Sequence, residues 1–235
     1  MSVILVPLPD RDFDVTEVAV PWRLLVDAGH QVVFATETGG APAADPKLLE
    51  GVLFGKLGAE PEPLAFYRQL LTDPAFLAPL RWEALEMTAF DALLLPGGHA
   101  PGMRQYLGSA MLQQQVREFW ALERPVAAIC HGVLPLARAG VLDGVRTTCL
   151  PKYLERSAFW LTAWKLGRYY RTYPAYVEDE VRASGAVFVR GPRAGSTRGT
   201  ATDDRPAFTV RDGRYLSARW PGDAYLFGKQ LVEML

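Results

Sequence analysis

The sequence predicts an α/β protein with a Rossmann-like (flavodoxin-like) parallel sheet and helices on both faces of that sheet. Two observations support this fold class. Short apolar runs rich in β-branched residues alternate with amphipathic stretches, which is the pattern of strands joined by crossover helices. The chain of 235 residues, 49% hydrophobic and 22% charged, is also long and apolar enough for one large domain with a real core. We therefore treat residues 1–235 as a single domain.

The expected elements follow the chain in order. Strands are predicted at 3–6, 31–35, 91–95 and 125–129, and helices at 16–28, 109–122 and 131–139. Gly29 and Gly140 are the expected ends of the first and last of these helices. Late strands are predicted at 186–189, 207–210 and 214–217, followed by a closing helix at 223–235.

Three segments interrupt this alternation. Residues 41–88 are rich in proline and glycine around one helical stretch near 64–71, so we expect an inserted cap. Residues 153–176 carry eight aromatic side chains, which could line a pocket or form an interface; the alternative is a helix packed on the core. Residues 191–205 are interpreted as a solvated loop, with an anion site as the alternative.

Composition and charge exclude several classes of partner. A net charge of -1 gives no electrostatic reason to expect nucleic acid or an anionic membrane. The apolar start of the chain is short and lacks a basic flank, so we expect no signal peptide, and no apolar run is long enough for a membrane span. Two cysteines cannot form a disulfide framework, which favours reduced thiols and a cytoplasmic location.

The motif that carries chemistry is Val126-Ala-Ala-Ile-Cys130-His131-Gly132. A strand that runs into a nucleophile, one further residue and glycine, before a helix, is the nucleophile-elbow pattern, here with Cys130 as the nucleophile. The sharp turn requires small neighbours, which explains Ala128 and Gly132. We expect the helix dipole to lower the pKa of the Cys130 thiol, and the His131 N–H to face an oxyanion. The alternative is an ordinary buried thiol.

A second loop, Leu95-Pro96-Gly97-Gly98-His99, ends the preceding predicted strand. Strand ends of an open parallel sheet line its functional crevice, and paired glycines allow a ligand to approach the backbone closely. We expect Gly98 N–H to be the second oxyanion donor, and Gly97 and His99 to contact substrate. A plain tight turn is the alternative.

Together these motifs closely resemble the ThiJ/PfpI superfamily, whose fold is that of class I glutamine amidotransferases. The resemblance covers nearly the whole chain. Thr16-Glu17-Val-Ala-Val-Pro21-Trp22 is similar to the family's first loop and helix, which implies that Glu17 hydrogen bonds the Cys130 sulfur. Without the resemblance, Glu17 reads as a solvated residue in a first helical turn.

One branch of the family, similar to bacterial heat-shock chaperone/glyoxalase III proteins, places an acid after the next strand, where it orients the histidine. Residues 144–155 match that stretch, so the resemblance implies a Cys130–His131–Glu155 triad. Val133 departs from the proline that commonly follows Cys-His-Gly, which alters the pocket. No histidine follows His131, so the distal His-x-Glu of glutaminases is missing and ammonia transfer from glutamine is not expected.

The leading functional hypothesis is a cysteine-dependent, cofactor-free enzyme that acts on a small reactive carbonyl such as methylglyoxal, or on a modified protein. Deglycation and weak peptidase or amidase activity use the same adduct chemistry. A stress holdase and a redox sensor based on Cys130 are the alternatives. The three histidines, His30, His99 and His131, have no ligand-like spacing, so no metal site is expected. By analogy with the family, the chain could form a homodimer.

Overall fold

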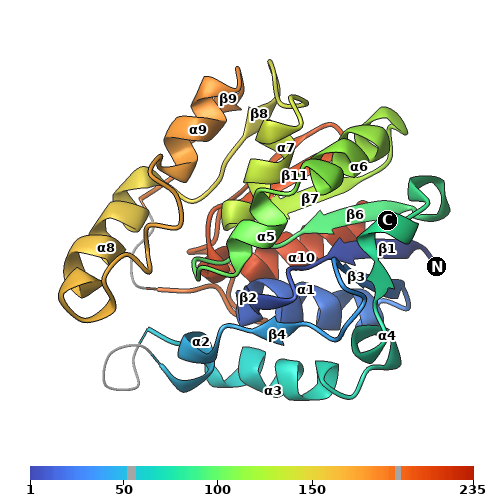
Figure 1. Ribbon diagram of the computed structural model, residues 1–235, viewed down its shortest axis with the longest axis horizontal. Helices are drawn as coiled ribbons and strands as arrows, with labels where there is room; N and C mark the ends of the chain where they lie inside the picture. Colours follow the sequence, from blue (N-terminus) through green and yellow to red (C-terminus); the bar gives the residue numbers. More distant parts are fainter. Residues whose placement is uncertain (52–56, 194–196) are drawn as a thin grey trace.

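The computed structural model describes residues 1–51, 57–193 and 197–235. A seven-stranded sheet crosses its centre in the order β10-β11-β7-β6-β1-β3-β5 (Figure 1). All neighbours pair in parallel except β10 and β11, which are antiparallel. The strands are β1 (Val3–Pro7), β3 (Gln31–Thr36), β5 (Leu80–Arg81), β6 (Ala92–Leu95), β7 (Val126–Ile129), β10 (Thr209–Asp212) and β11 (Tyr215–Ala218). The predicted fold class is confirmed.

The central strands lie in the sequence where continuous apolar runs predicted them. Every residue of β6 and β7 is buried, because helices cover both faces of a parallel sheet. The late strands differ more from the prediction. The run at 186–189 forms only β9 (Val187–Phe188), which pairs with β8 (Arg146–Thr147) in a separate sheet. Val187 is 50% exposed, so this strand lies outside the buried centre.

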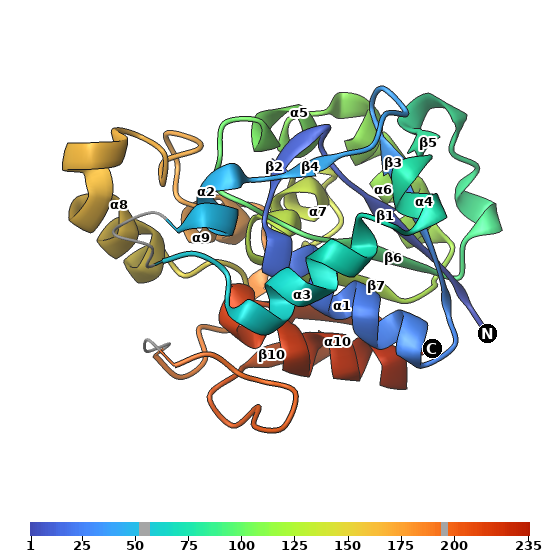
Figure 2. The ribbon, with the colours of Figure 1, turned by 90° about the horizontal axis from the view of Figure 1, so that it is seen from below.

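Helices cover both faces of the sheet (Figures 1 and 2). On one face lie α1 (Val15–Asp27), α3 (Pro61–Leu70) and α10 (Ala224–Glu233); on the other lie α5 (Met103–Leu107), α6 (Ala110–Ala121) and α7 (Leu134–Arg138). The predicted helix at 131–139 begins later than expected, because Cys130–Val133 form a 3₁₀ turn before α7. Shorter 3₁₀ turns occupy Trp82–Ala84, Met87–Ala89 and Pro221–Asp223.

The inserted segment lies mainly along one side of the sheet. It contains β4 (Ala43–Ala44), which pairs with β2 (Arg11–Phe13), then α2 (Pro46–Glu50), α3, α4 (Pro74–Leu77) and β5. The helix expected near 64–71 is α3, which packs against α1. Residues 52–56 of the predicted cap, and residues 194–196 of the predicted loop, lie outside the described residues.

The aromatic segment forms α8 (Lys152–Leu166) and the turn that leads to α9 (Val177–Ala183). Both helices lie at one end of the molecule, beyond the carboxyl ends of the central strands (Figure 1). Within the described ranges, no helix is long and apolar enough to cross a membrane.

Candidate active site

The backbone at the end of β7 makes the turn expected of a nucleophile elbow. Cys130 has a φ of 59°, a left-handed conformation that costs a non-glycine residue about 1–2 kcal/mol. Gly132 cannot carry a side chain, because a Cβ there would overlap the backbone of Leu95. A Cβ on Gly97 would lie 2.7 Å from the backbone nitrogen of His131. The two glycines therefore allow the loops that follow β6 and β7 to pack backbone against backbone.

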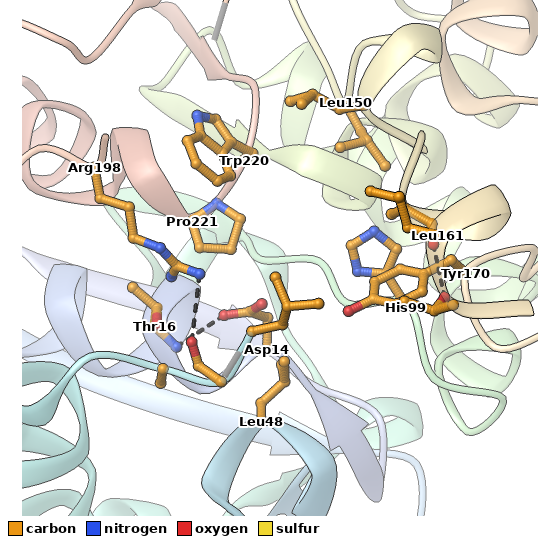
Figure 3. A pocket seen from close by; sticks show the side chains of 16 residues that line it. Asp14, Thr16, Leu48, His99, Leu150, Leu161, Tyr170, Arg198, Trp220 and Pro221 are labelled. Carbon is orange, nitrogen blue, oxygen red and sulfur yellow. Dashed lines mark hydrogen bonds between the residues drawn. The ribbon is translucent and has the colours of Figure 1, made fainter. Parts of the chain in front are cut away.

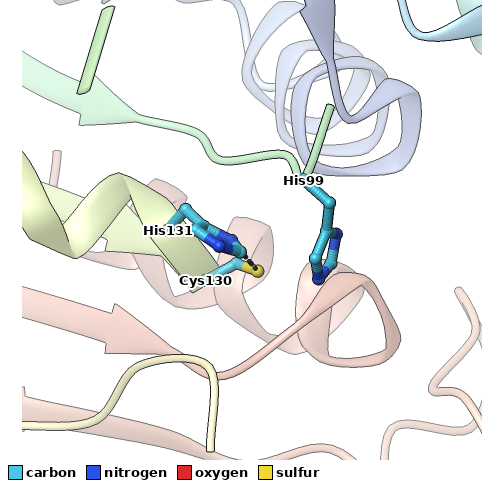
Figure 4. Close-up of side chains that lie close together, drawn as sticks. All are labelled: His99, Cys130 and His131. Carbon is cyan, nitrogen blue, oxygen red and sulfur yellow. Dashed lines mark hydrogen bonds between the residues drawn. The ribbon is translucent and has the colours of Figure 1, made fainter. Parts of the chain in front are cut away.

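Three side chains surround the Cys130 sulfur. His131 Nδ1 lies 3.5 Å from Sγ, and the His99 ring lies 4.7 Å from the His131 ring in an edge-to-face arrangement (Figure 4). Glu17, on the first turn of α1, accepts a 2.8 Å hydrogen bond from the Gly97 N–H. Its second carboxyl oxygen, Oε1, is buried without a hydrogen-bond partner, so the hydrogen bond to the Cys130 sulfur that the resemblance implies stays a prediction. Cys130, His131 and Glu17 are all buried.

Burial keeps this cluster uncharged. It raises the pKa of the Cys130 thiol well above its usual value, and the nearby carboxylates of Glu17 and Asp14 raise it further. The expectation of a lowered thiol pKa was therefore wrong. The His131 N–H of the short 3₁₀ turn does stabilise the thiolate and lower the pKa, but desolvation of the thiolate has the larger, opposite effect. Burial, followed by the charge of Asp14, also raises the pKa of Glu17. Burial therefore disfavours the charged form of both the Glu17 carboxyl and the Cys130 thiol.

Burial has the opposite effect on the two imidazoles. It lowers the pKa of His99 to about 4, and it lowers the pKa of His131 well below the usual value, with His99 and Arg138 as further causes. Both rings are neutral at pH 7. A neutral imidazole is the form of histidine that accepts a proton, but the lowered pKa of His131 and the raised pKa of the Cys130 thiol disfavour a resting thiolate–imidazolium pair.

Glu155 does not complete the predicted triad in this structure. Its carboxylate accepts a 3.1 Å hydrogen bond from the Val177 N–H, at the first turn of α9. Among the described residues no hydrogen bond joins it to His131, and both His131 Nε2 and Glu155 Oε1 are buried without a partner. The expected His131–Glu155 hydrogen bond is thus absent, because the Glu155 carboxylate, at the start of α8, instead accepts from a backbone N–H in the first turn of α9, where N–H groups have no partner within the helix. A catalytic role for Glu155 stays a prediction.

The oxyanion hole also stays a prediction. Gly98 packs closely against the segment before α1: a Cβ on Gly98 would lie 2.9 Å from Asp12 O and 3.0 Å from Asp14 N. Asp14 N–H in turn donates to Gly97 O at 2.9 Å. These contacts hold the glycine loop in place beside the His131 backbone nitrogen.

A cavity of about 390 Å³ opens beside this cluster (Figure 3). His99 forms part of its wall, as expected of a substrate-contacting residue, whereas Cys130 lies behind His99 and is not part of the lining. Sequence reasoning did not single out Asp14, Arg198 or Trp220, which also line it. Asp14 could be read only as a helix cap, and Arg198 lies in the segment interpreted as a solvated loop.

The Cys130 thiol and the two neighbouring imidazoles have the donor atoms of a metal site. The candidate ligand atoms of His99, Cys130 and His131 lie within 4.8 Å of one another. Two imidazoles and a thiolate suit a soft ion such as Zn²⁺. Spacing along the chain did not indicate this group, because the residues meet through two loops at the ends of neighbouring strands. The expectation of no metal stays a prediction.

A doubly covered parallel sheet that presents a buried cysteine on a strained elbow defines a class of α/β proteins with a nucleophile-type site. The chain belongs within that class to the ThiJ/PfpI family: a family model described as ThiJ/PfpI family-like matches residues 8–192.

Known proteins resemble the chain over almost all of its length. An uncharacterized protein of Schizosaccharomyces pombe is 29% identical over 236 residues, covering 97% of this chain and 82% of the yeast protein. A deglycase of Pyrococcus abyssi is 27% identical, covering 95% of this chain and 93% of the deglycase. The crystal structure of glyoxalase III from Candida albicans superimposes with a TM-score of 0.71 at 17% identity, covering 100% of this chain and 97% of the other. At 17% identity, the similarity to glyoxalase III shows that the two proteins share a fold.

Proposed function

We propose that the protein is a cysteine-dependent enzyme that converts small α-oxoaldehydes into 2-hydroxy acids, a glyoxalase III-like activity with deglycation as a related reaction. The observation that carries this proposal is the placement of Cys130 at a positive φ, with His131 Nδ1 3.5 Å from its sulfur and Glu17 beside it. Relatives named as deglycases support the same chemistry.

The proposed reaction begins at the thiol. Cys130 Sγ attacks the aldehyde carbon of methylglyoxal, and the thiol proton passes through His131 to the aldehyde oxygen, which gives a hemithioacetal. His131 is neutral at pH 7, so it can act as the base in this step. Burial raises the pKa of Glu17 well above its usual value, which favours the protonated carboxyl; in that form Glu17 donates a hydrogen bond without placing a second anion next to the sulfur.

The remaining steps need only water. His131 moves the proton from C1 of the hemithioacetal to C2, and the hydroxyl proton on the C1 oxygen passes to the C2 oxygen, which leaves a thioester of the 2-hydroxy acid on Cys130. Water then hydrolyses the thioester: the S–C bond breaks, the thiol regains its proton and lactic acid leaves. Overall, one water is added to one oxoaldehyde, with no net oxidation. Gly98 and His131 N–H groups are the proposed donors to the oxygen anions along this path.

The test compares wild type with Cys130→Ala and with Cys149→Ala, a matched control because Cys149 is the second buried thiol and lies outside the cluster. Methylglyoxal is the substrate, and lactate is measured by NMR. We expect lactate from wild type and Cys149→Ala, and only the uncatalysed rate from Cys130→Ala. Lactate formation that survives Cys130→Ala, or none from wild type, would rule out the proposal.

A second candidate function, binding of unfolded proteins, is supported by one observation. Trp160, Leu161 and Trp164 on α8 are 72%, 69% and 74% exposed, an unusual grouping of large apolar side chains on a surface. The redox-sensor alternative is not favoured, because sensor thiols are accessible thiolates and the Cys130 thiol is buried with a raised pKa.

A further inference from the structure

The cavity beside His99 is larger than methylglyoxal requires. Its volume of about 390 Å³ falls in the range of roughly 300–1,000 Å³ typical of pockets that enclose drug-sized ligands. Its walls come from several separate parts of the chain, among them the start of α1, α2, the segment at 57–59, the loop with His99, α8 and the turn after β11. A pocket of this size beside the nucleophile indicates a substrate with a substantial side group.

Apolar side chains form most of the pocket surface. Leu48, Ala59, Leu150, Leu154, Ala158 and Trp220 are among the residues that line it. Leu150 and Leu154 also pack against the main core, so this wall is continuous with the interior of the protein. Figure 3 shows leucine side chains and the Trp220 ring on opposite sides of the cavity, with His99 and Tyr170 at one end. A ligand that buries apolar atoms against such a lining binds more tightly, because apolar surface is removed from water.

The single positive charge among the described residues that line the pocket, Arg198, is already offset by carboxylates. Arg198 donates a 3.3 Å hydrogen bond to Gly58 O, and its Nε lies 3.9 Å from a Glu60 carboxylate oxygen. It also lowers the pKa of Asp14, whose burial nevertheless raises that pKa to about 6, so Asp14 is ionised at pH 7. Thr162 donates its hydroxyl to Ala158 O. Because one guanidinium faces two carboxylates, the pocket has no excess positive charge for an anionic ligand.

The reacting end of the pocket is defined by His99. The centroid of its ring lies 4.9 Å from that of the Tyr170 ring on the pocket side. The ring nitrogen of His99 that could bind a metal lies within 4.8 Å of the Cys130 sulfur. A carbonyl group placed next to His99 therefore lies at the entrance to the thiol, while the rest of the molecule extends between α8 and Trp220.

We propose that this pocket selects neutral α-oxoaldehydes with a bulky apolar side group, such as aryl or branched-alkyl glyoxals, over methylglyoxal and over anionic carbonyl compounds. This inference rests on the proposed function, which it narrows to one substrate class. Filling an apolar pocket with a side group of this size is worth about tenfold to hundredfold in kcat/KM.

The first experiment compares initial rates with phenylglyoxal and methylglyoxal, before either compound modifies arginine. We expect kcat/KM to favour phenylglyoxal by at least about tenfold. Ala158→Phe fills the pocket from α8 and should lower this preference by about tenfold or more. Ala163→Phe is the matched control on the same helix, because Ala163 does not line the cavity. It should leave both rates unchanged. Equal kcat/KM values in wild type, or a preference that survives Ala158→Phe, would overturn the inference.

A binding measurement separates this inference from the proposed function. Cys130→Ala protein is titrated by calorimetry with acetophenone, which is neutral, and with benzoate, which is its anionic counterpart. We expect acetophenone to bind at least tenfold more tightly than benzoate. In protein that also carries Ala158→Phe, the affinity for acetophenone should be lower. If wild type turns over neither glyoxal but this pattern is found, the proposed reaction fails and the pocket assignment holds. Tighter binding of benzoate, or no binding of acetophenone, would refute the assignment of a neutral apolar ligand.

Discussion

The loops that carry the thiol and the α8 side of the pocket meet at His99, yet they are held in different ways. In the elbow region, residues 96–99 and 130–133, backbone packs on backbone, and a Cβ on Gly97 or Gly132 has no room. On α8, side chains form the wall, and Leu161 lines the cavity while remaining 69% exposed. The proposed reaction therefore depends on a region with little room for substitution, and the proposed substrate preference depends on a region where side chains can vary.

Gly132→Ala should have the largest effect on stability and would test the rigid side of this comparison. The new Cβ would overlap the Leu95 backbone, so β6 and the elbow must move apart, at a cost of about 3 kcal/mol or more. Gly140→Ala is the control. Gly140 has a φ of 74° but open space around it, so it should cost only about 1 kcal/mol. Urea unfolding measures both, and equal losses would show that close approach is not required at Gly132.

Glu155→Gln tests whether α8 contributes to the chemistry or only to the fold. Burial raises the pKa of Glu155 from 4.5 to about 7, so the folded protein binds this proton more tightly than the unfolded chain. Wild type should therefore lose up to about 3 kcal/mol of unfolding free energy between pH 4.5 and pH 7, relative to Glu155→Gln. Urea unfolding at a series of pH values measures this difference, and equal pH dependence in wild type and Glu155→Gln would contradict it.

The same variant decides the predicted triad. Because the Glu155 carboxylate is engaged by Val177 N–H, we expect Glu155→Gln to lower turnover by less than about tenfold. A loss of roughly 10²–10⁴-fold, the usual contribution of general acid–base catalysis, would instead show that Glu155 orients His131 during the reaction.

Glu17→Gln should shift the titration of the thiol downward. After burial, the charge of the nearby Glu17 carboxyl is the next cause that raises the pKa of Cys130, and an amide at this position has no charge. The pKa of Cys130 should therefore fall, as followed by thiolate absorbance near 240 nm across pH. Glu233→Gln should leave that titration where it is. An unchanged pKa in Glu17→Gln would remove Glu17 from the site.

The smallest effect is expected on the outer face of α8. Replacing Trp160 and Trp164 with serine changes exposed positions, so the unfolding free energy should shift by no more than about 0.5 kcal/mol for each. Leu154→Ser, on the inner face of the same helix, should cost more. If the protein suppresses aggregation of a heat-unfolded client, the double variant should lose that activity. Unchanged suppression would exclude this face as the binding surface.

The two regions also differ in how far the sequence predicts them. Cys130, Gly132 and Gly97 could be identified because the local backbone dictates which residues fit, and that constraint is visible in a short motif. Asp14, Arg198 and Trp220 carry no such signal, since only tertiary packing brings them to one cavity. The direction of the Glu155 side chain depends on where α9 begins, which residues 144–155 alone do not reveal. The lowered thiol pKa was wrong because burial cannot be inferred from an elbow motif.

Complete burial of the Cys130 sulfur has a consequence for the lifetime of the protein. Peroxides and most electrophiles react with exposed thiolates, and a protonated thiol behind His99 offers them neither charge nor access. In the proposed reaction, only a molecule that fits the cavity and places its carbonyl at His99 comes close to the sulfur. Burial of the thiol should therefore slow its modification by reactive compounds that would otherwise consume it.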